Sequence, residues 1–418
     1  MARADNSRRG DRDRLSSLPD CLIHLIMSFL TAQEAVRTCI LSKRWKNLWT
    51  TLPFLDFDWR KSKYDRKWDP DEWDYSEYQI HKLEKFRDFV TMTLLLREPS
   101  ELHKFRLSFL DGEFYDLCRY DIFIRSWILH ALKYNLQVLH FSFSRYYDPY
   151  PQGSLHLGIF TCASLVDASL HSTISVRNIE VINLPCLKRL HLKMIALSQN
   201  FVGKLFCGCP VLELLHLENC GAERFSTNSK SLKHLKVENG CWGGDSEKSM
   251  ELIDTPNLVS LYYPMCPYIF DQCKMLLKMP SLTSASIHSH YHYRGQSNVL
   301  IGLSNVQYLV LFGENIKGAM EIELPNCPVF SNLKNLSVNN LCLRCHFNIL
   351  ASFLSHCPNL EKLSLCYLGC YCKWDALGNQ ESLKIAPFEG KRLQTVEVKF
   401  SRSDRNFPQD HEVFTGYH

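Results

Sequence analysis

The most regular feature of this chain is a hexamer of apolar and polar positions, L-x-x-L-x-L with conservative replacements, which recurs from residue 102 onwards. In each hexamer the last four residues alternate between apolar and polar side chains, and this period of two is typical of a β-strand with one buried face. The first leucine fills the core where the chain enters the strand. We therefore predict twelve short strands, in hexamers that begin at Leu102, Leu136, Leu165, Leu187, Leu212, Leu232, Leu258, Leu282, Val306, Leu333, Leu360 and Leu393.

The spacing of these hexamers indicates a repeat architecture. The inner starts are 20 to 29 residues apart, and the first and last intervals are 34 and 33. A period of about 20–29 residues is that of leucine-rich repeats, whose units bury their apolar faces by stacking on one another. Helical spacing of apolar residues predicts return helices in two of the connecting segments, at Phe201, Leu205 and Phe206, and at Ile349, Leu350, Phe353 and Leu354. Residues 101–400 thus predict an α/β solenoid, a horseshoe with a parallel sheet on its concave face.

A different pattern occupies the first sixty residues. The stretch LPDCLIHLIMSFL, residues 18–30, is apolar almost all the way round a helix, so we expect it to be covered on several sides. Thr31 and Glu34 form the T-x-x-E capping box of a second helix, and Ser42 is the expected cap of a third, KRWKNLW. Three short helices make a poor independent core. The pattern therefore predicts a unit that a partner completes.

Other segments connect and flank these two regions. Residues 59–77 are charged and contain a proline, so they read as a linker. A helix that caps the solenoid is expected at 78–100, with Ile80, Leu83, Phe86, Val90 and Leu94 on its apolar face. Charged residues predict tails at 1–13 and 401–418.

Composition narrows the class of protein. The 418 residues include 48 basic and 44 acidic side chains, and this near balance counts against a nucleic-acid-binding repeat protein, one alternative for the basic strands. The amino-terminal residues lack the apolar core of a secretory signal, and no apolar run approaches the length of a membrane span. We therefore expect a protein of the cytoplasm or the nucleus, or both.

The 18 cysteines are expected to be reduced in that compartment and to act as compact core residues. Cys209, Cys220 and Cys357 fall at core positions of the repeats. The pairs Cys342/Cys345 and Cys370/Cys372, and His288, His290 and His292 in HSHYHY, have spacings that favour structural or loop roles over a metal site. Neither a metal nor another cofactor is expected.

The segment DRLSSLPDCLIHLIMSFLTAQEAVRTCILSKRWKNLWTTLPFLDFD resembles the F-box of plant F-box/leucine-rich-repeat proteins, with expected bounds 14–58. Thr31 stands where the family often has proline, and the capping box accommodates it. FSNLKNLSVNNL and FLSHCPNLEKLSL, within 330–400, resemble the FBD region of such proteins, which here is incomplete or degenerate.

This resemblance implies the substrate-recognition subunit of an SCF-type ubiquitin ligase. The F-box would bind a Skp-type adaptor, and through it cullin and RING subunits, while the repeats hold a target protein. The subunit itself is non-catalytic. The implied adaptor-binding residues are Leu18, Pro19, Leu22, Ile23, Ile26, Leu30, Leu41 and Trp45, although Trp45 could instead fasten the three helices together. A scaffold that binds the adaptor without delivering a target is the alternative.

The side chains between the inward leucines form the candidate target-binding face. The candidates are Lys188, Arg189, His191, His216, Lys236, Tyr262, Tyr308 and Phe312. Because the early strands are basic, the target is expected to present acidic groups there, with solvated surface lysines as the alternative interpretation.

Overall fold

In the computed structural model of the chain, the described residues are 15–61, 75–110, 121–144, 157–172, 179–197, 200–220, 226–238, 251–265, 275–289, 299–313, 316–340, 343–367 and 390–400. They fall into two compact units, Met1–Ser172 and Thr173–His418.

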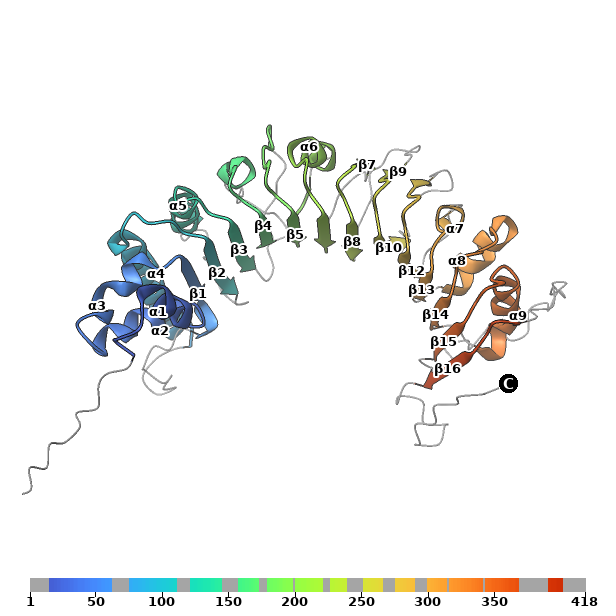
Figure 1. Cartoon of the computed structure of the whole chain (residues 1–418), viewed down its shortest axis with the longest axis horizontal. Helices are drawn as coiled ribbons and strands as arrows, with labels where there is room; N and C mark the ends of the chain where they lie inside the picture. The colour runs from blue at the N-terminus through green and yellow to red at the C-terminus, as the bar shows by residue number, and fades with distance from the viewer. Residues whose placement is uncertain are drawn as a thin grey trace, which may run out of the picture. The chain divides into compact units, whose positions relative to one another are not determined.

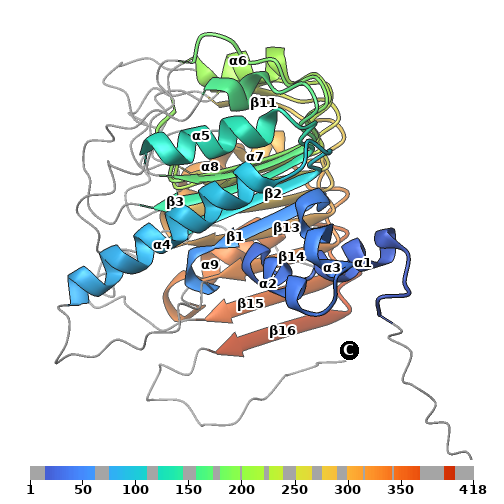
Figure 2. The same ribbon diagram turned by 90° about the vertical axis from the view of Figure 1, so that its left-hand side faces the viewer.

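The first unit begins with three short helices, each built around apolar side chains. It then continues through the first four strands of a parallel sheet, in the order β1-β2-β3-β4 (Figure 1), with the longer helices α4 and α5 between β1 and β2 and between β2 and β3 in the sequence (Figure 2). Its elements are α1 (Asp20–Met27), α2 (Ala32–Arg37), η1 (Thr38–Ile40), α3 (Trp45–Leu48), η2 (Trp49–Thr51), β1 (Phe54–Asp58), η3 (Trp59–Lys61), α4 (Tyr75–Leu96), β2 (Lys104–Leu110), α5 (Asp121–Leu132), β3 (Val138–Ser144), η5 (Leu157–Thr161) and β4 (Asp167–Ser172).

The second unit repeats one supersecondary motif. Its main sheet is parallel, in the order β5-β6-β8-β10-β12-β13-β14-β15-β16, and the return helices lie on one side of the strands (Figure 1). The strands of this sheet are β5 (Arg189–Lys193), β6 (Leu214–Glu218), β8 (His234–Glu238), β10 (Ser260–Met265), β12 (Ser284–Ser289), β13 (Tyr308–Gly313), β14 (Asn335–Asn339), β15 (Lys362–Tyr367) and β16 (Thr395–Phe400). The helices are α6 (Phe201–Gly208), α7 (Val299–Gly302), α8 (Ile316–Glu323), η6 (Leu324–Asn326) and α9 (Leu343–Leu354).

All twelve predicted hexamers end in a strand, so the repeat pattern is confirmed across both units. The inward positions form the core: Leu190, Leu192, Leu215 and Leu217 are all at most 1% exposed. The predicted return helices are confirmed as well, because α6 buries Phe201 and Leu205, and α9 buries the four residues predicted for it, Ile349, Leu350, Phe353 and Leu354.

The structure adds two features that the sequence pattern did not predict. Strand β1, at the end of the expected F-box, pairs with β2 in parallel register, so that Leu55 lies opposite Phe105 and Phe57 opposite Leu107. In the second unit a separate three-stranded parallel sheet, order β11-β9-β7, forms from parts of the return segments. Its strands are β7 (Ser226–Asn228), β9 (Glu251–Asp254) and β11 (Met275–Lys278).

The predicted helix at 78–100 is observed as α4, which begins at Tyr75 and ends at Leu96. Leu83, Phe86, Val90 and Leu94 are buried as expected, whereas Ile80 is 49% exposed, so its assignment to the buried face was wrong. The linker interpretation of 59–77 falls largely on residues outside the described ranges, as do both predicted tails.

The caps of the first helices follow the sequence in one case and differ in the other. The capping box is confirmed: Glu34 N donates to Thr31 Oγ1 at 3.3 Å, and Thr31 N donates to Glu34 Oε2 at 3.0 Å. Ser42 does not cap the third helix, because α3 begins later, at Trp45, and the Ser42 hydroxyl lies 2.9 Å from Ser16 Oγ. Within the described ranges, no helix combines the length and the apolar character needed to cross a bilayer.

Candidate functional site

The three N-terminal helices have a small core of their own. Ile23, Met27, Ala35, Trp45 and Leu52 are buried together in it, and Leu18, Leu30, Leu48 and Trp49 pack against this cluster. Ile23 is 0% and Trp45 3% exposed. The prediction that these two side chains face an adaptor was therefore wrong: they fasten the helices to one another, which is the alternative that the sequence had left open for Trp45.

A second group of apolar residues in the same segment is exposed. Of the predicted adaptor-binding residues, Leu22 is 43%, Ile26 39% and Leu41 59% exposed, and Pro19 is also exposed. Leu18 and Leu30 are half-buried. Leu22 and Ile26 are four residues apart on α1 and therefore share one face of the helix. An adaptor contact by these six residues stays a prediction.

Sequence reasoning missed three of the most exposed apolar side chains in this segment. Phe29 is 83%, Ile40 85% and Leu25 54% exposed. The signal for Leu25 and Phe29 was present, because they lie three residues beyond Leu22 and Ile26 and extend the same apolar run. We refer below to Leu22, Leu25, Ile26, Phe29, Ile40 and Leu41 as the N-terminal apolar set.

The N-terminal helices are tied to the repeat sheet within the first unit. Besides the β1–β2 pairing, Arg97 at the end of α4 is 7% exposed and donates hydrogen bonds to four backbone carbonyls. Its guanidinium reaches Leu52 O at 3.2 Å, Glu98 O at 3.1 Å, Ser100 O at 2.7 Å and Glu101 O at 2.8 Å. Burial lowers the pKa of Arg97 from its ordinary value. One buried cation thus joins the end of the helical segment to the entry of β2.

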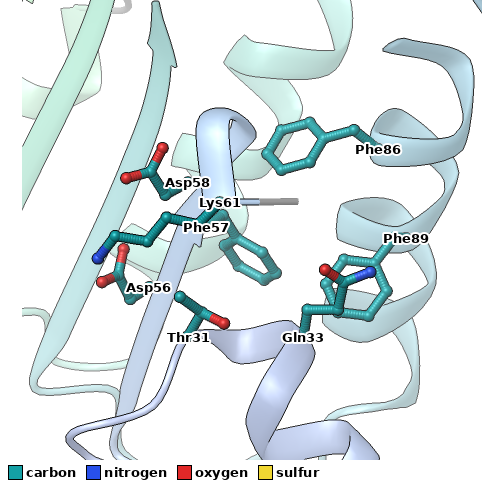
Figure 3. A pocket seen from close by; sticks show the side chains of 8 residues that line it. All are labelled: Thr31, Gln33, Asp56, Phe57, Asp58, Lys61, Phe86 and Phe89. Carbon is teal, nitrogen blue, oxygen red and sulfur yellow. The ribbon is translucent and has the colours of Figure 1, made fainter. Parts of the chain in front are cut away.

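A shallow pocket lies at this junction, where α2, β1 and α4 meet. Thr31 and Gln33 line it from the helical segment, Asp56, Phe57, Asp58 and Lys61 from β1 and the turn after it, and Phe86 and Phe89 from α4 (Figure 3). The rings of Phe57 and Phe89 meet edge to face, with centroids 6.0 Å apart. Burial raises the pKa of Asp56, although Arg106 and Lys61 oppose this shift. The aromatic side chains that line the pocket therefore pack the junction together.

The predicted target-binding face is a continuous row of side chains in the second unit. Strand register places the central outward residues opposite one another from β5 to β16. This outward row is His191, His216, Lys236, Tyr262, Ser286, Val310, Ser337, Ser364 and Glu397. Its order follows from the repeat alone and is confirmed. Of the other candidates, Arg189, Tyr308 and Phe312 lie on the same face of their strands, and Lys188 comes just before β5.

On strands β5, β6 and β8, several of the basic side chains are paired with carboxylates. Glu218 Oε1 lies 2.5 Å from Lys193 Nζ, and Glu238 lies 2.6 Å from His216 Nε2 and 3.0 Å from Lys236 Nζ. Burial raises the pKa of Glu218, but the hydrogen bond and charge of Lys193, together with His191 and His216, outweigh it and leave that pKa below its ordinary value. Much of the positive charge on β5, β6 and β8 is therefore already compensated by carboxylates.

The middle strands carry a different surface. The outward positions of β10, β12, β13 and β14 are free of Asp, Glu, Lys and Arg; they are Ser260, Tyr262, Pro264, Ser284, Ser286, His288, Tyr308, Val310, Phe312, Asn335, Ser337 and Asn339. Phe312 lies opposite His288 in the register of β12 and β13. Its ring stacks on His288 with centroids 4.7 Å apart and tilts against Tyr262 at 5.6 Å.

The cysteine prediction is confirmed for the three named repeat positions, whereas Cys21, Cys186 and Cys207 are exposed, so the expectation of a core role was wrong for them. Cys209, Cys220 and Cys357 are buried, and the Cys220 thiol donates to Leu192 O at 3.3 Å. The Cys370/Cys372 pair, His290 and His292, and Cys342 with the side chain of Cys345, lie outside the described residues.

Comparisons with known proteins match both regions of the chain. The family model described as "F-box domain" matches residues 15–57, and the one described as "FBD-associated F-box protein At5g56370, LRR repeats" matches residues 124–292.

Three similar proteins come from Arabidopsis thaliana. F-box/LRR-repeat protein At3g59200 is 31% identical over 85% of this chain and 69% of its own length. Putative F-box/FBD/LRR-repeat protein At3g59240 is 30% identical over 84% of this chain and 68% of its own length. Putative F-box/LRR-repeat protein At3g42770 is 30% identical over 84% of this chain, and the match spans 64% of that relative's length.

Proposed function

Because the chain belongs to the plant F-box/leucine-rich-repeat family, whose members are generally non-catalytic adaptors, we propose that it is the substrate-recognition subunit of an SCF-type ubiquitin ligase. Its F-box binds a Skp-type adaptor, through which cullin and RING subunits join the complex. The repeats hold the target protein. The proposed site of action is the cytoplasm, the nucleus or both.

The N-terminal apolar set is the observation that carries this proposal. A helical segment with a complete core of its own still exposes Phe29 and Ile40 by more than four fifths. Large apolar side chains that gather on a surface mark interaction sites, because leaving them in water costs about 1.5–3 kcal/mol for each side chain. Adaptor binding would remove this surface from water.

The adaptor contact can be tested with a purified Skp-type adaptor and the double variant Leu22→Asp plus Ile26→Asp. Both side chains are exposed, so the variant should fold, with a melting curve close to that of the parent. Placing two carboxylates in an apolar contact should weaken adaptor binding at least about 30-fold, as expected for the loss of interface hot spots. Isothermal titration calorimetry measures the change directly.

Phe347→Asp is the matched control, because Phe347 is an apolar residue of α9 that is 60% exposed in the second unit. It should leave adaptor binding unchanged. Ile23→Asp should instead unfold the helical segment, since Ile23 is 0% exposed. Adaptor binding that survives in the Leu22/Ile26 variant would contradict the proposed role.

For the target, we propose that the outward side chains of β10, β12, β13 and β14, which carry no charge, make the central contacts. Interfaces concentrate their binding energy in buried aromatic residues surrounded by a polar rim, and Tyr262 and Phe312 have this chemistry. The exposed basic residues Lys188 and Arg189 lie on the earlier side, where they can meet acidic groups of the target.

Proximity labelling in cells can separate these contributions. Tyr262→Ala plus Phe312→Ala should lose proteins that the parent labels, while cullin and adaptor labelling remains. Lys188→Glu plus Arg189→Glu should lose the same proteins only if their acidic groups are bound here. If neither variant changes the labelled set apart from the ligase subunits, a scaffold without a delivered target is the better assignment.

A further inference from the structure

Two histidines and one glutamate meet on the outward face of β5 and β6. The parallel register places His191 directly opposite His216, and their rings are stacked with centroids 4.1 Å apart and an angle of 4° between them. Glu218 follows His216 by two residues on the same face, and its Oε2 lies 3.4 Å from His191 Nε2. One donor atom from each of these three side chains lies within 4.8 Å of the other two.

This donor set has the chemistry of a transition-metal site. Imidazole nitrogen and carboxylate oxygen bind Zn²⁺ at about 2.0–2.2 Å, and three protein ligands with a water complete a tetrahedron. Most imidazoles are neutral near pH 7.5, as a ligand must be. The two backbones are already held by the sheet, so a small rotation of each side chain is enough to bring the three donors together.

We propose that His191, His216 and Glu218 form a binding site for a divalent transition-metal ion of the zinc class. All three side chains are half-buried, which leaves one side of the ion open to water or to a donor atom from a bound partner. Since His191 and His216 belong to the outward row, an ion here would sit on the same surface as the proposed target contacts.

The neighbouring charges set the strength of this site. Lys193 Nζ lies 2.5 Å from Glu218 Oε1, and the imidazole of His216 donates to Glu238 Oε2 at 2.6 Å. An incoming ion would displace both interactions. Glu238 would then lie next to the ion and add negative charge, whereas Lys193 would oppose binding.

The test is titration of the full chain with Zn²⁺ at pH 7.5 after chelator treatment. All accessible thiols, among them those of the exposed Cys21, Cys186 and Cys207, are alkylated beforehand so that they do not bind zinc. The parent should bind one equivalent that His191→Ala and His216→Ala each weaken at least about 100-fold, because even the loss of an outer-shell partner costs 10–100-fold. Circular dichroism of each variant verifies the fold.

His234→Ala is the matched control. His234 lies on the adjacent strand β8 with its Nδ1 2.8 Å from Ser260 Oγ, outside the proposed donor set, and the variant should keep the bound equivalent. Lys193→Met should tighten Zn²⁺ binding about two- to five-fold, because it frees Glu218 from a competing ammonium group. A merely structural role for these side chains would not produce that gain.

Two results would overturn the site. In the first, the equivalent persists in both His191→Ala and His216→Ala, so the zinc is bound elsewhere. In the second, His234→Ala weakens binding as much as the other two, so the uptake is not specific to these three side chains.

Discussion

Two cysteines at the end of α6 illustrate how strongly the repeat sets the environment of a single residue. Cys207 is exposed, whereas Cys209, two positions later, is 1% exposed. Burial raises the pKa of Cys209 to about 12 and that of Cys220 to about 11. Because the thiolate is the reactive form, both buried thiols should be inert in the folded protein.

We predict that iodoacetamide at pH 8 modifies Cys207 at least about ten times faster than Cys209 or Cys220. All three cysteines lie in one tryptic fragment, residues 205–224, so fragment-ion mass spectrometry can compare them within a single peptide. In denaturant their rates should become similar. Equal rates in the folded chain would show that the core opens at this repeat.

Asp56 gives a prediction about pH. Its pKa is raised by burial, so between its ordinary value of 3.8 and the raised value the folded state binds more protons than the unfolded state. Stability contributed by this group is therefore lost as pH rises through that window. Arg106, Lys61 and Lys104 reduce the effect, and Asp58 adds to it.

Asp56→Asn removes this loss. Its free energy of unfolding should therefore increase relative to that of the parent as pH rises from about 4 to 7, so the variant becomes relatively more stable. Urea denaturation at several pH values, followed by tryptophan fluorescence, measures the difference. A difference that is constant with pH would mean that Asp56 does not titrate in this range.

At the scale of single residues, alternation along a strand was a reliable guide and apolar character alone was not. The outward row and the buried cysteines follow from repeat position. Ile23 and Trp45 were misassigned because an apolar helix has the same pattern whether its side chains are covered by its own neighbours or by a partner. Ile23 is buried and Leu22 exposed only because of how the helices pack, and the local sequence does not encode that packing.

At the scale of elements, the strands that the sequence pattern missed are short or belong to another region. The segment FLDFD has the alternation of a strand, but it forms the end of the F-box resemblance, so its pairing with β2 was not expected. The segments of β7, β9 and β11 are three or four residues long, too short for a periodic signal.

Arg97 links elements of the first unit, so its removal should lower the stability of that unit. Arg97→Ala leaves buried carbonyls, including Leu52 O, without their donor, and should lower the free energy of unfolding by about 3 kcal/mol. Arg87→Ala, on helix α4 before Arg97, is the control, because Arg87 pairs with the exposed Asp88 and its loss should cost less than about 1 kcal/mol. Equal costs in urea denaturation would contradict the joining role of Arg97.

At the scale of the whole chain, the first unit should remain together after a cut in its backbone. We propose inserting a site for a specific protease between residues 62 and 74 and cleaving there. The β1–β2 pairing, the Phe57–Phe89 contact and the Arg97 hydrogen bond to Leu52 should hold the amino-terminal fragment in place. Both fragments should then elute together in gel filtration, and separate elution would contradict this expectation.

The place of β1 also limits how this protein can be shortened or recombined. Because this F-box ends in a strand of the neighbouring sheet, it cannot be transferred to another protein as an independent domain. A chain that starts after Asp58 would leave the backbone of β2 as a bare edge and uncover Phe105 and Leu107, both now 0% exposed. Such unprotected edges invite association between copies. A chimera in which the N-terminal helices are replaced should therefore keep residues 54–58 with the repeats.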